Sequence, residues 1–135
     1  MKSTFIVILV ILLSLAYARS SQWRSERVIS AEHYVRPKQG NMRYAPFNHH
    51  GIKMGTDKGN DYLIHNMPKT GPVVTDAKHM SADWRKRKDI KVTGHKTVGE
   101  VLGSAGTSYI GGGTCIGTAC AVKNHLKKEP KKKHH

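Results

Sequence analysis

Apolar residues form one continuous run near the start of the chain. The run Phe5–Ala16 carries no charge and follows Lys2, which is the arrangement of a signal peptide, with a positive start and an apolar stretch of roughly 7–15 residues. A membrane-spanning helix needs about 20 apolar residues, so the pattern favours a signal peptide over an anchor. Small residues stand at Ala16 and Ala18, and we expect cleavage after Ala18 and a secreted, extracellular protein.

The middle of the chain alternates between apolar and polar residues, as β-strands do. The segments His49–Gly55 and Asp61–Met67 flank the turn sequence TDKGND, which predicts a β-hairpin. We expect a third strand around Val73, a fourth over Asp89–Thr93 and a further short strand over Ser108–Ile110.

Two helices are predicted in the C-terminal part. Thr97 and Glu100 have the spacing of a capping box, in which each side chain bonds a backbone N–H of the first turn. The short helix that follows should end at Gly103 or Gly106.

The second predicted helix begins at Cys115, with Thr114 as its N-cap. Its apolar stripe follows the i, i+4, i+7, i+11 spacing of a helix packed by one face. The stripe consists of Cys115, Ala119, Val122 and Leu126, widened by Ile116 and Cys120. The positions expected to face water are Lys123, Asn124, Lys127 and Lys128.

These elements predict four parts of the chain. Residues 1–18 are the signal peptide, and residues 19–43 are a polar, basic arm. Residues 44–127 form one small α+β domain, because a hairpin and further strands precede the helices. Residues 128–135 form a basic tail whose like charges keep it in water.

The formal net charge of the chain is +14. Such a charge favours anionic partners, among them membrane surfaces and the bacterial cell wall, and a basic face would concentrate the protein there. Specific recognition of nucleic acid is not expected. The charge determines neither the partner nor the oligomeric state.

The two cysteines, Cys115 and Cys120, allow three interpretations. A disulfide is usual in a secreted chain, yet residues five apart in a helix have Cα atoms about 8–9 Å apart, beyond the ~7 Å limit of a bridge. The same spacing directs the two side chains apart and disfavours a shared metal ion. The third interpretation is a nucleophile at one cysteine and a small core residue at the other.

A cysteine at a helix N-terminus is favoured as a thiolate by the helix dipole and by unpaired N–H groups, which singles out Cys115. Cys120, with Thr118 as its cap, is the second choice. A thiol nucleophile needs a histidine base and a group that orients it. The hairpin offers His49 or His50 on one strand and His65 on the next.

The hairpin also resembles a known superfamily. The sequence HHGIKMG of His49–Gly55 resembles the H-x-G-I-x-aliphatic-G strand of the papain-like superfamily that contains NlpC-like cell-wall peptidases and lecithin:retinol acyltransferase-like enzymes. Tyr62–Pro68 is similar to their second strand and Gly71–Val74 to the next. Thr97–Leu126 looks like the closing part of the acyltransferase-like branch, whose order of His, His and Cys is circularly permuted.

This resemblance implies a small papain-like fold, with an antiparallel sheet packed against helices and the nucleophile at a helix N-terminus. It implies His49 as the general base, His65 as the residue that orients it and Cys115 as the nucleophile, with no cofactor and no metal. Here TCIGT replaces the N-C-E-H-F and D-C-S-G sequences of the two branches, and a basic tail replaces the apolar anchor of the acyltransferases.

The expected function is therefore that of a secreted thiol hydrolase or acyltransferase. Its substrate would be an ester or amide in a lipid, a peptide or a cell-wall peptide. The alternative is a non-enzymatic cationic effector that binds anionic membranes, polysaccharide or nucleic acid. A histidine-rich metal binder is the third interpretation.

Overall fold

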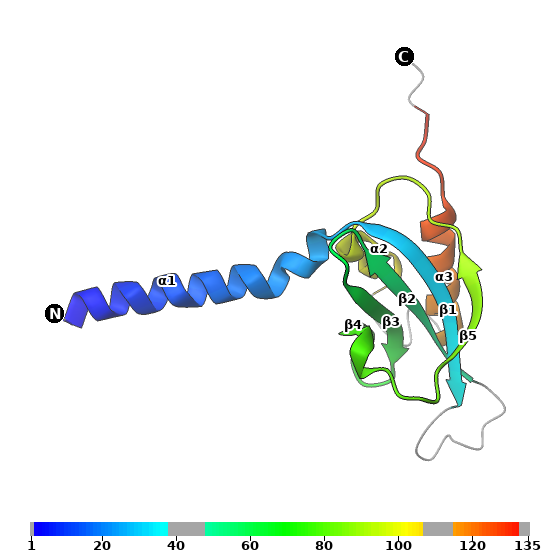
Figure 1. Ribbon diagram of the computed structural model, residues 1–135, viewed down its shortest axis with the longest axis horizontal. Helices are drawn as coiled ribbons and strands as arrows, with labels where there is room; N and C mark the ends of the chain where they lie inside the picture. Colours follow the sequence, from blue (N-terminus) through cyan, green and yellow to red (C-terminus); the bar gives the residue numbers. More distant parts are fainter. Residues whose placement is uncertain (1, 38–47, 107–114, 133–135) are drawn as a thin grey trace.

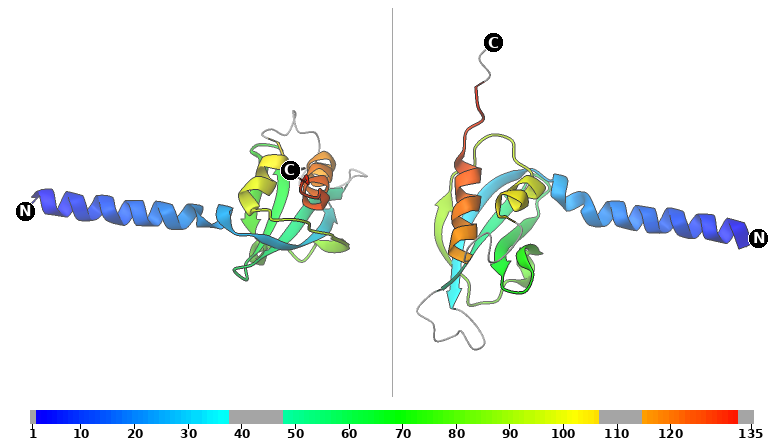
Figure 2. Two further views of the ribbon diagram at one scale, coloured as in Figure 1. Left: turned by 90° about the horizontal axis from the view of Figure 1, so that it is seen from above. Right: turned by 180° about the vertical axis from the view of Figure 1, so that it is seen from behind.

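The computed structural model describes residues 2–37, 48–106 and 115–132. A five-stranded antiparallel sheet with the strand order β4-β3-β2-β1-β5 carries α2 and α3 on one face, as Figures 1 and 2 show. The expected α+β class is confirmed at this level. The strands are β1 (Val28–Pro37), β2 (Asn48–Thr56), β3 (Asp61–Met67), β4 (Gly71–Asp76) and β5 (Arg85–Ile90). The α-helices are α1 (Lys2–Ser21), α2 (Val98–Ser104) and α3 (Cys115–Lys127), and the 3₁₀ helices are η1 (Gln22–Ser25) and η3 (Ala77–His79).

Helix α1 projects away from the sheet as a single rod (Figure 1). The large apolar side chains from Phe5 to Leu15 are 46–70% exposed, so this segment takes no part in the core. Among the described residues, no helix is long and apolar enough to cross a membrane.

The core lies between the sheet and the two C-terminal helices. Ile52 and Met54 of β2 and Ile64 of β3 pack in one buried cluster with side chains of α2 and α3. The helical residues of that cluster are Val98, Val101, Ala119, Val122 and Leu126. Every second residue of β2 and β3 therefore faces the helices, as a half-covered antiparallel sheet requires.

The predicted hairpin is confirmed. Strand β3 has the expected bounds, β2 extends one residue beyond them at each end, and β4 contains the expected third strand. The capping box of Thr97 and Glu100 is present at the start of α2. This helix continues through Gly103, and Gly106, with φ +85°, lies just beyond its end in the left-handed region that glycine tolerates.

The sheet begins earlier in the chain than the sequence indicates. Residues 28–37, assigned above to the basic arm, form β1, which lies inside the sheet between β2 and β5. A register shift between Val28 and Ser30 interrupts the pairing of β1 with β2. Because such a bulge breaks the two-residue period, Val28 and Ala31 are buried three residues apart, and the strand pattern is hidden.

The fourth strand is also displaced. β5 covers Arg85–Ile90, and only Ile90 is buried within it, whereas the alternation had indicated Asp89–Thr93. β5 is an edge strand that pairs with β1 alone. Exposed charge is common on edge strands because it prevents pairing with other chains, and so β5 lacks the apolar alternation of an interior strand.

Helix α3 begins at Cys115, as expected, and buries Ala119, Val122 and Leu126. Ile116 and Cys120 are exposed, so the prediction that they widen the apolar stripe is wrong. Successive helix residues point about 100° apart, so Cys120 points away from the buried stripe that contains Ala119. The sheet covers only that narrow stripe. The expected cap Thr114 and the expected strand at 108–110 lie outside the described residues.

Side chains hold both ends of α3. In the first turn, the buried Thr118 hydroxyl accepts a hydrogen bond of 2.9 Å from the Nδ2 of Asn66 in β3. At the other end, the buried Lys96 ammonium donates to the carbonyls of Leu126 and Lys128 at 2.9 and 2.8 Å. A cation at these carbonyls complements the negative end of the helix dipole. These bonds thus determine the position of α3 along its own axis.

We predict that Thr118→Val destabilises the fold by about 1–3 kcal/mol, because the Asn66 amide loses a buried partner at nearly constant side-chain volume. Thr75→Val is the matched control, since Thr75 is exposed on β4 and should change stability by less than about 0.5 kcal/mol. Urea unfolding of both variants measures the difference. Equal effects would show that the bond to Asn66 does not anchor α3.

Candidate functional site

The structure brings His49 and His65 together. The Nε2 atom of His49 in β2 lies 2.9 Å from the Nδ1 atom of His65 in β3. The register pairs Gly51 with His65, so the two histidines are diagonal neighbours on one face of the hairpin. They are only 7% and 9% exposed. The two hairpin histidines named by the family resemblance therefore form a buried, hydrogen-bonded pair.

Trp84 covers this histidine pair. Its ring centroid lies 5.5 Å from that of His49 and 6.0 Å from that of His65, with the His65 ring edge-on to it. Gly51 makes room for this packing, because a Cβ atom there would lie 2.8 Å from Leu63 Cδ1 and 3.1 Å from the Trp84 ring. This packing explains why a glycine occupies the third position of the H-x-G sequence. Sequence reasoning missed Trp84, which lies in the irregular segment between η3 and β5.

The surroundings of the pair keep His65 neutral. Burial, followed by the nearby positive charge of Arg36, lowers the pKa of His65 from 6.5 to about 4. The Arg36 guanidinium lies 5.0 Å from the centre of the Trp84 ring, a cation–π geometry. A cavity of about 270 Å³ opens beside His65, and Arg36, Met80 and Trp84 are among the residues that line it.

The third predicted residue, Cys115, opens α3, but its side chain lies outside the described part of the structure. The Asn66–Thr118 bond places the first turns of α3 at the end of the sheet that carries the histidine pair. His65 and Asn66 are consecutive in β3, so their side chains point to opposite faces. The His49–His65 pair and α3 therefore lie on opposite faces of the sheet.

A second histidine pair lies on the helix face of the sheet. The Nε2 atom of His33 in β1 is 2.9 Å from the Nδ1 atom of His50 in β2. Burial, followed by the charge of Lys123 in α3, lowers the pKa of His33 to about 4. The sequence offered His50 as an alternative base, and the structure separates it from His65. His33 was missed because β1 was assigned to the arm.

Cys120 is an exposed free thiol, so its interpretation as a small core residue is wrong. Its sulfur lies 3.9 Å from the Asn124 amide nitrogen one turn later in α3. A free Cys120 also contradicts the Cys115–Cys120 disulfide that the sequence left open. Within the residues that the structure describes, no group of three or more His, Cys, Asp or Glu side chains is placed to hold a metal ion.

Comparison with known proteins identifies a viral relative. No family model and no solved structure matches the chain. A protein of Acanthamoeba polyphaga mimivirus, named "Uncharacterized protein R800", is 34% identical to it over 88 residues, which cover 60% of this chain and 76% of the viral protein. The chain belongs to the family of this viral protein. Since most of the viral protein is matched, the two should share a domain and not merely a short motif.

Gly51→Ala should displace Trp84 from the histidine pair. The added Cβ would overlap Leu63 and the tryptophan ring, and such overpacking costs about 1–3 kcal/mol. Gly103→Ala is the control, because a Cβ atom at this position in α2 meets nothing within 4 Å. Alanine there should leave stability unchanged or raise it by up to about 1 kcal/mol. Thermal unfolding and tryptophan fluorescence measure both effects, and a neutral Gly51→Ala would contradict the packing.

Protonation of the buried histidines should oppose folding. The folded-state pKa of His33 and of His65, about 4, lies below the ordinary 6.5, so the unfolded chain binds more protons between these values. Their contribution to the free energy of unfolding is complete above pH 6.5 and is lost as the pH falls toward 4. We expect a loss on the order of a few kcal/mol.

Unfolding in urea at pH 7.0, 5.5 and 4.5 measures this loss. His33→Gln should make it smaller, whereas His79→Gln, at an exposed position, should leave it unchanged. Equal pH dependence in the wild type and in His33→Gln would show that His33 is not held neutral by the fold.

Proposed function

We propose that the chain is a thiol hydrolase or acyltransferase of the permuted papain-like kind, with Cys115 as nucleophile, His49 as base and His65 as the orienting residue. The observation that carries the proposal is the hydrogen bond between His49 Nε2 and His65 Nδ1. It orients the ring of a buried histidine near the end of the sheet at which α3, on the opposite face, begins with a cysteine. The proposed mechanism requires no metal or cofactor.

In this proposal, the two histidines divide the roles that thiol catalysis needs. One nitrogen of the base accepts the thiol proton, and the other donates to a group that stabilises the imidazolium. Here Nδ1 of His49 would accept the proton while Nε2 donates to His65. Because its pKa is lowered to about 4, His65 is uncharged at neutral pH and can accept that bond without repelling the cation.

Helix α3 supports the nucleophile. Cys115 is its first residue, where the positive end of the helix dipole stabilises a thiolate. The first-turn N–H groups have no partner within the helix, and they can donate to the oxyanion that forms when a carbonyl is attacked.

The proposed reaction has two steps, acylation of the thiol and transfer of the acyl group to an acceptor. The Cys115 thiol passes its proton to His49 and its sulfur attacks the carbonyl of an ester or amide. The leaving alcohol or amine departs with that proton, and an acyl-thioester remains. Water or a second acceptor then gives a proton to His49, attacks the thioester and restores the thiol. Lipids, peptides and cell-wall peptides are the candidate acyl donors.

Residues 1–18 would direct the chain to secretion, since Phe5–Ala16 is an apolar run preceded by Lys2. Removal of Lys2 with residues 1–18 lowers the net charge from +14 to +13, and this charge would hold the secreted protein on anionic membranes or cell walls. The enzyme would then meet its substrate at a surface.

A second candidate function is that of a cationic effector without catalysis. Arg87 and Lys88 in β5 lie near Lys123 in α3, and burial, followed by the charge of Lys88, lowers the pKa of Lys123. None of the three forms an ion pair within the described residues. Such uncompensated charge favours an anionic surface.

Acetylation by p-nitrophenyl acetate tests the enzymatic proposal. Intact-mass and peptide analysis should locate one acetyl group on Cys115, and His49→Gln should slow its formation about 100-fold or more. The control Cys120→Ala removes the exposed thiol and should leave the rate unchanged. Acetylation of Cys120 alone, or an equal rate in His49→Gln, would contradict the proposal and favour the cationic effector.

A further inference from the structure

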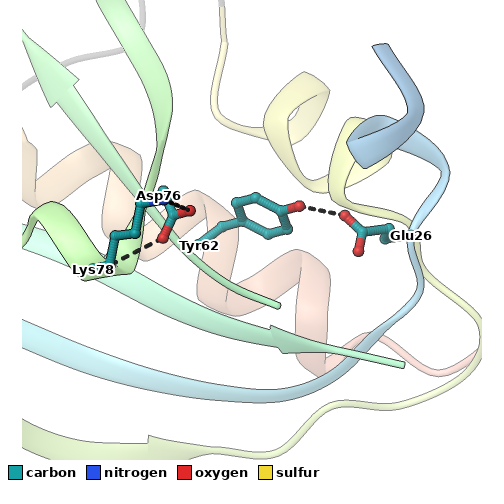
Figure 3. Close-up of polar contacts among 4 residues, drawn as sticks. All are labelled: Glu26, Tyr62, Asp76 and Lys78. Atoms are coloured by element: carbon teal, nitrogen blue, oxygen red, sulfur yellow. Dashed lines mark hydrogen bonds and ion pairs between the residues drawn. The ribbon is translucent and has the colours of Figure 1, made fainter. Parts of the chain in front are cut away.

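Glu26 is a buried carboxylate just before β1. It is 6% exposed, and it accepts hydrogen bonds from the hydroxyl of Thr56, the amide of Asn60 and the hydroxyl of Tyr62. Figure 3 shows the Tyr62 ring directed toward this carboxylate. All three donors are neutral groups, so they solvate the carboxylate without balancing its charge.

The missing counter-charge is unexpected in this chain, which contains 23 lysine and arginine residues. Within the part of the chain that the structure describes, no cationic side chain forms an ion pair with Glu26. Buried carboxylates are usually paired with a cation, because the removal of an isolated charge from water is costly. A cation supplied from outside would meet this need.

A cavity of about 380 Å³ lies against Glu26, within the range of about 300–1,000 Å³ that is usual for small-molecule sites. The aromatic rings of Trp23 and Tyr62 line it, with centroids 6.2 Å apart and planes inclined by 45°. The Arg24 guanidinium lies 4.8 Å from the Trp23 ring centre, a cation–π geometry that the negative face of an indole favours. A second carboxylate, Asp57, belongs to the same lining.

We propose that this cavity binds an alkylammonium group, with its charge on the Glu26 carboxylate and its alkyl carbons against Trp23 and Tyr62. Aromatic walls around a carboxylate are suited to such a cation, since the rings contribute both apolar surface and a negative π face. Lys58 also lines the cavity and is exposed, so its charge disfavours a ligand with several positive charges. Tyr62 lies at the opposite end of β3 from His65, so the site does not depend on thiol chemistry.

Tryptophan fluorescence of the full chain tests the proposal. The chain has two tryptophans, so Trp84→Phe leaves Trp23 as the only indole reporter. Titration with n-butylammonium chloride at pH 7 should give a saturable change with a Kd in the millimolar range. The neutral analogue 1-butanol should give none, and Glu26→Gln should weaken n-butylammonium binding at least tenfold.

Variants that keep the fold make the test decisive. Thermal unfolding must show that Glu26→Gln is folded; if it is not, saturation-transfer NMR on n-butylammonium compares Trp23→Leu with Trp84→Phe. The signal should be lost in the first variant and kept in the second. No saturable response in the Trp84→Phe chain, an equal response to 1-butanol, or binding that survives both Glu26→Gln and Trp23→Leu would overturn the proposal.

The ammonium group could belong to a free amine or to a lysine side chain of a peptide. The tripeptide Gly-Lys-Gly with blocked ends distinguishes the two sources. Binding at least tenfold tighter than that of n-butylammonium would assign a peptide ligand, and equal or weaker binding would assign a small amine.

Discussion

The register of β2 against β3 is the constraint on which the rest of the structure depends. Ile52 pairs with Ile64 and Gly51 with His65, so alternate residues serve two different faces. One face supplies the apolar surface that α2 and α3 cover, and the other carries His49 and His65 under Trp84. A slip of one residue would move the apolar set to the open face. The same pairing therefore determines both the core and the candidate site.

The position of α3 along the sheet is the second constraint, because its buried side chains must meet those of β2 and β3. Apolar packing alone would allow the helix to slide along its axis. The hydrogen bond from Asn66 to Thr118 and the bonds from Lys96 to the last carbonyls prevent this. Both sets of hydrogen bonds are made by buried polar groups. Their loss lowers the stability of the fold more than the loss of an equal number of exposed hydrogen bonds. The placement of the cysteine thus depends on residues far from it in the chain.

Turn sequences, capping residues and apolar spacing predicted the elements that depend on residues close together in the chain. The turn TDKGND defined β2 and β3, the Thr97–Glu100 spacing defined the start of α2, and the apolar spacing defined α3. The bulge near Val28 concealed β1, and charge concealed β5, since neither strand shows plain alternation. The His49–His65 pair followed from the family resemblance, whereas Trp84 and His33 did not, because contacts between distant segments leave no local signal.

Buried and exposed ionisable groups of this basic protein are stabilised in different ways. On the surface, Lys86 of β5 pairs with Glu32 and Asp89, whereas Arg87 and Lys88 form no ion pair within the described residues. Inside, His33 and His65 avoid charge, and each shares a hydrogen bond with another histidine. Glu26 instead receives three neutral donors. The interior thus holds the His49–His65 pair toward one end of β3 and the Glu26 carboxylate, bonded by Tyr62, near the other.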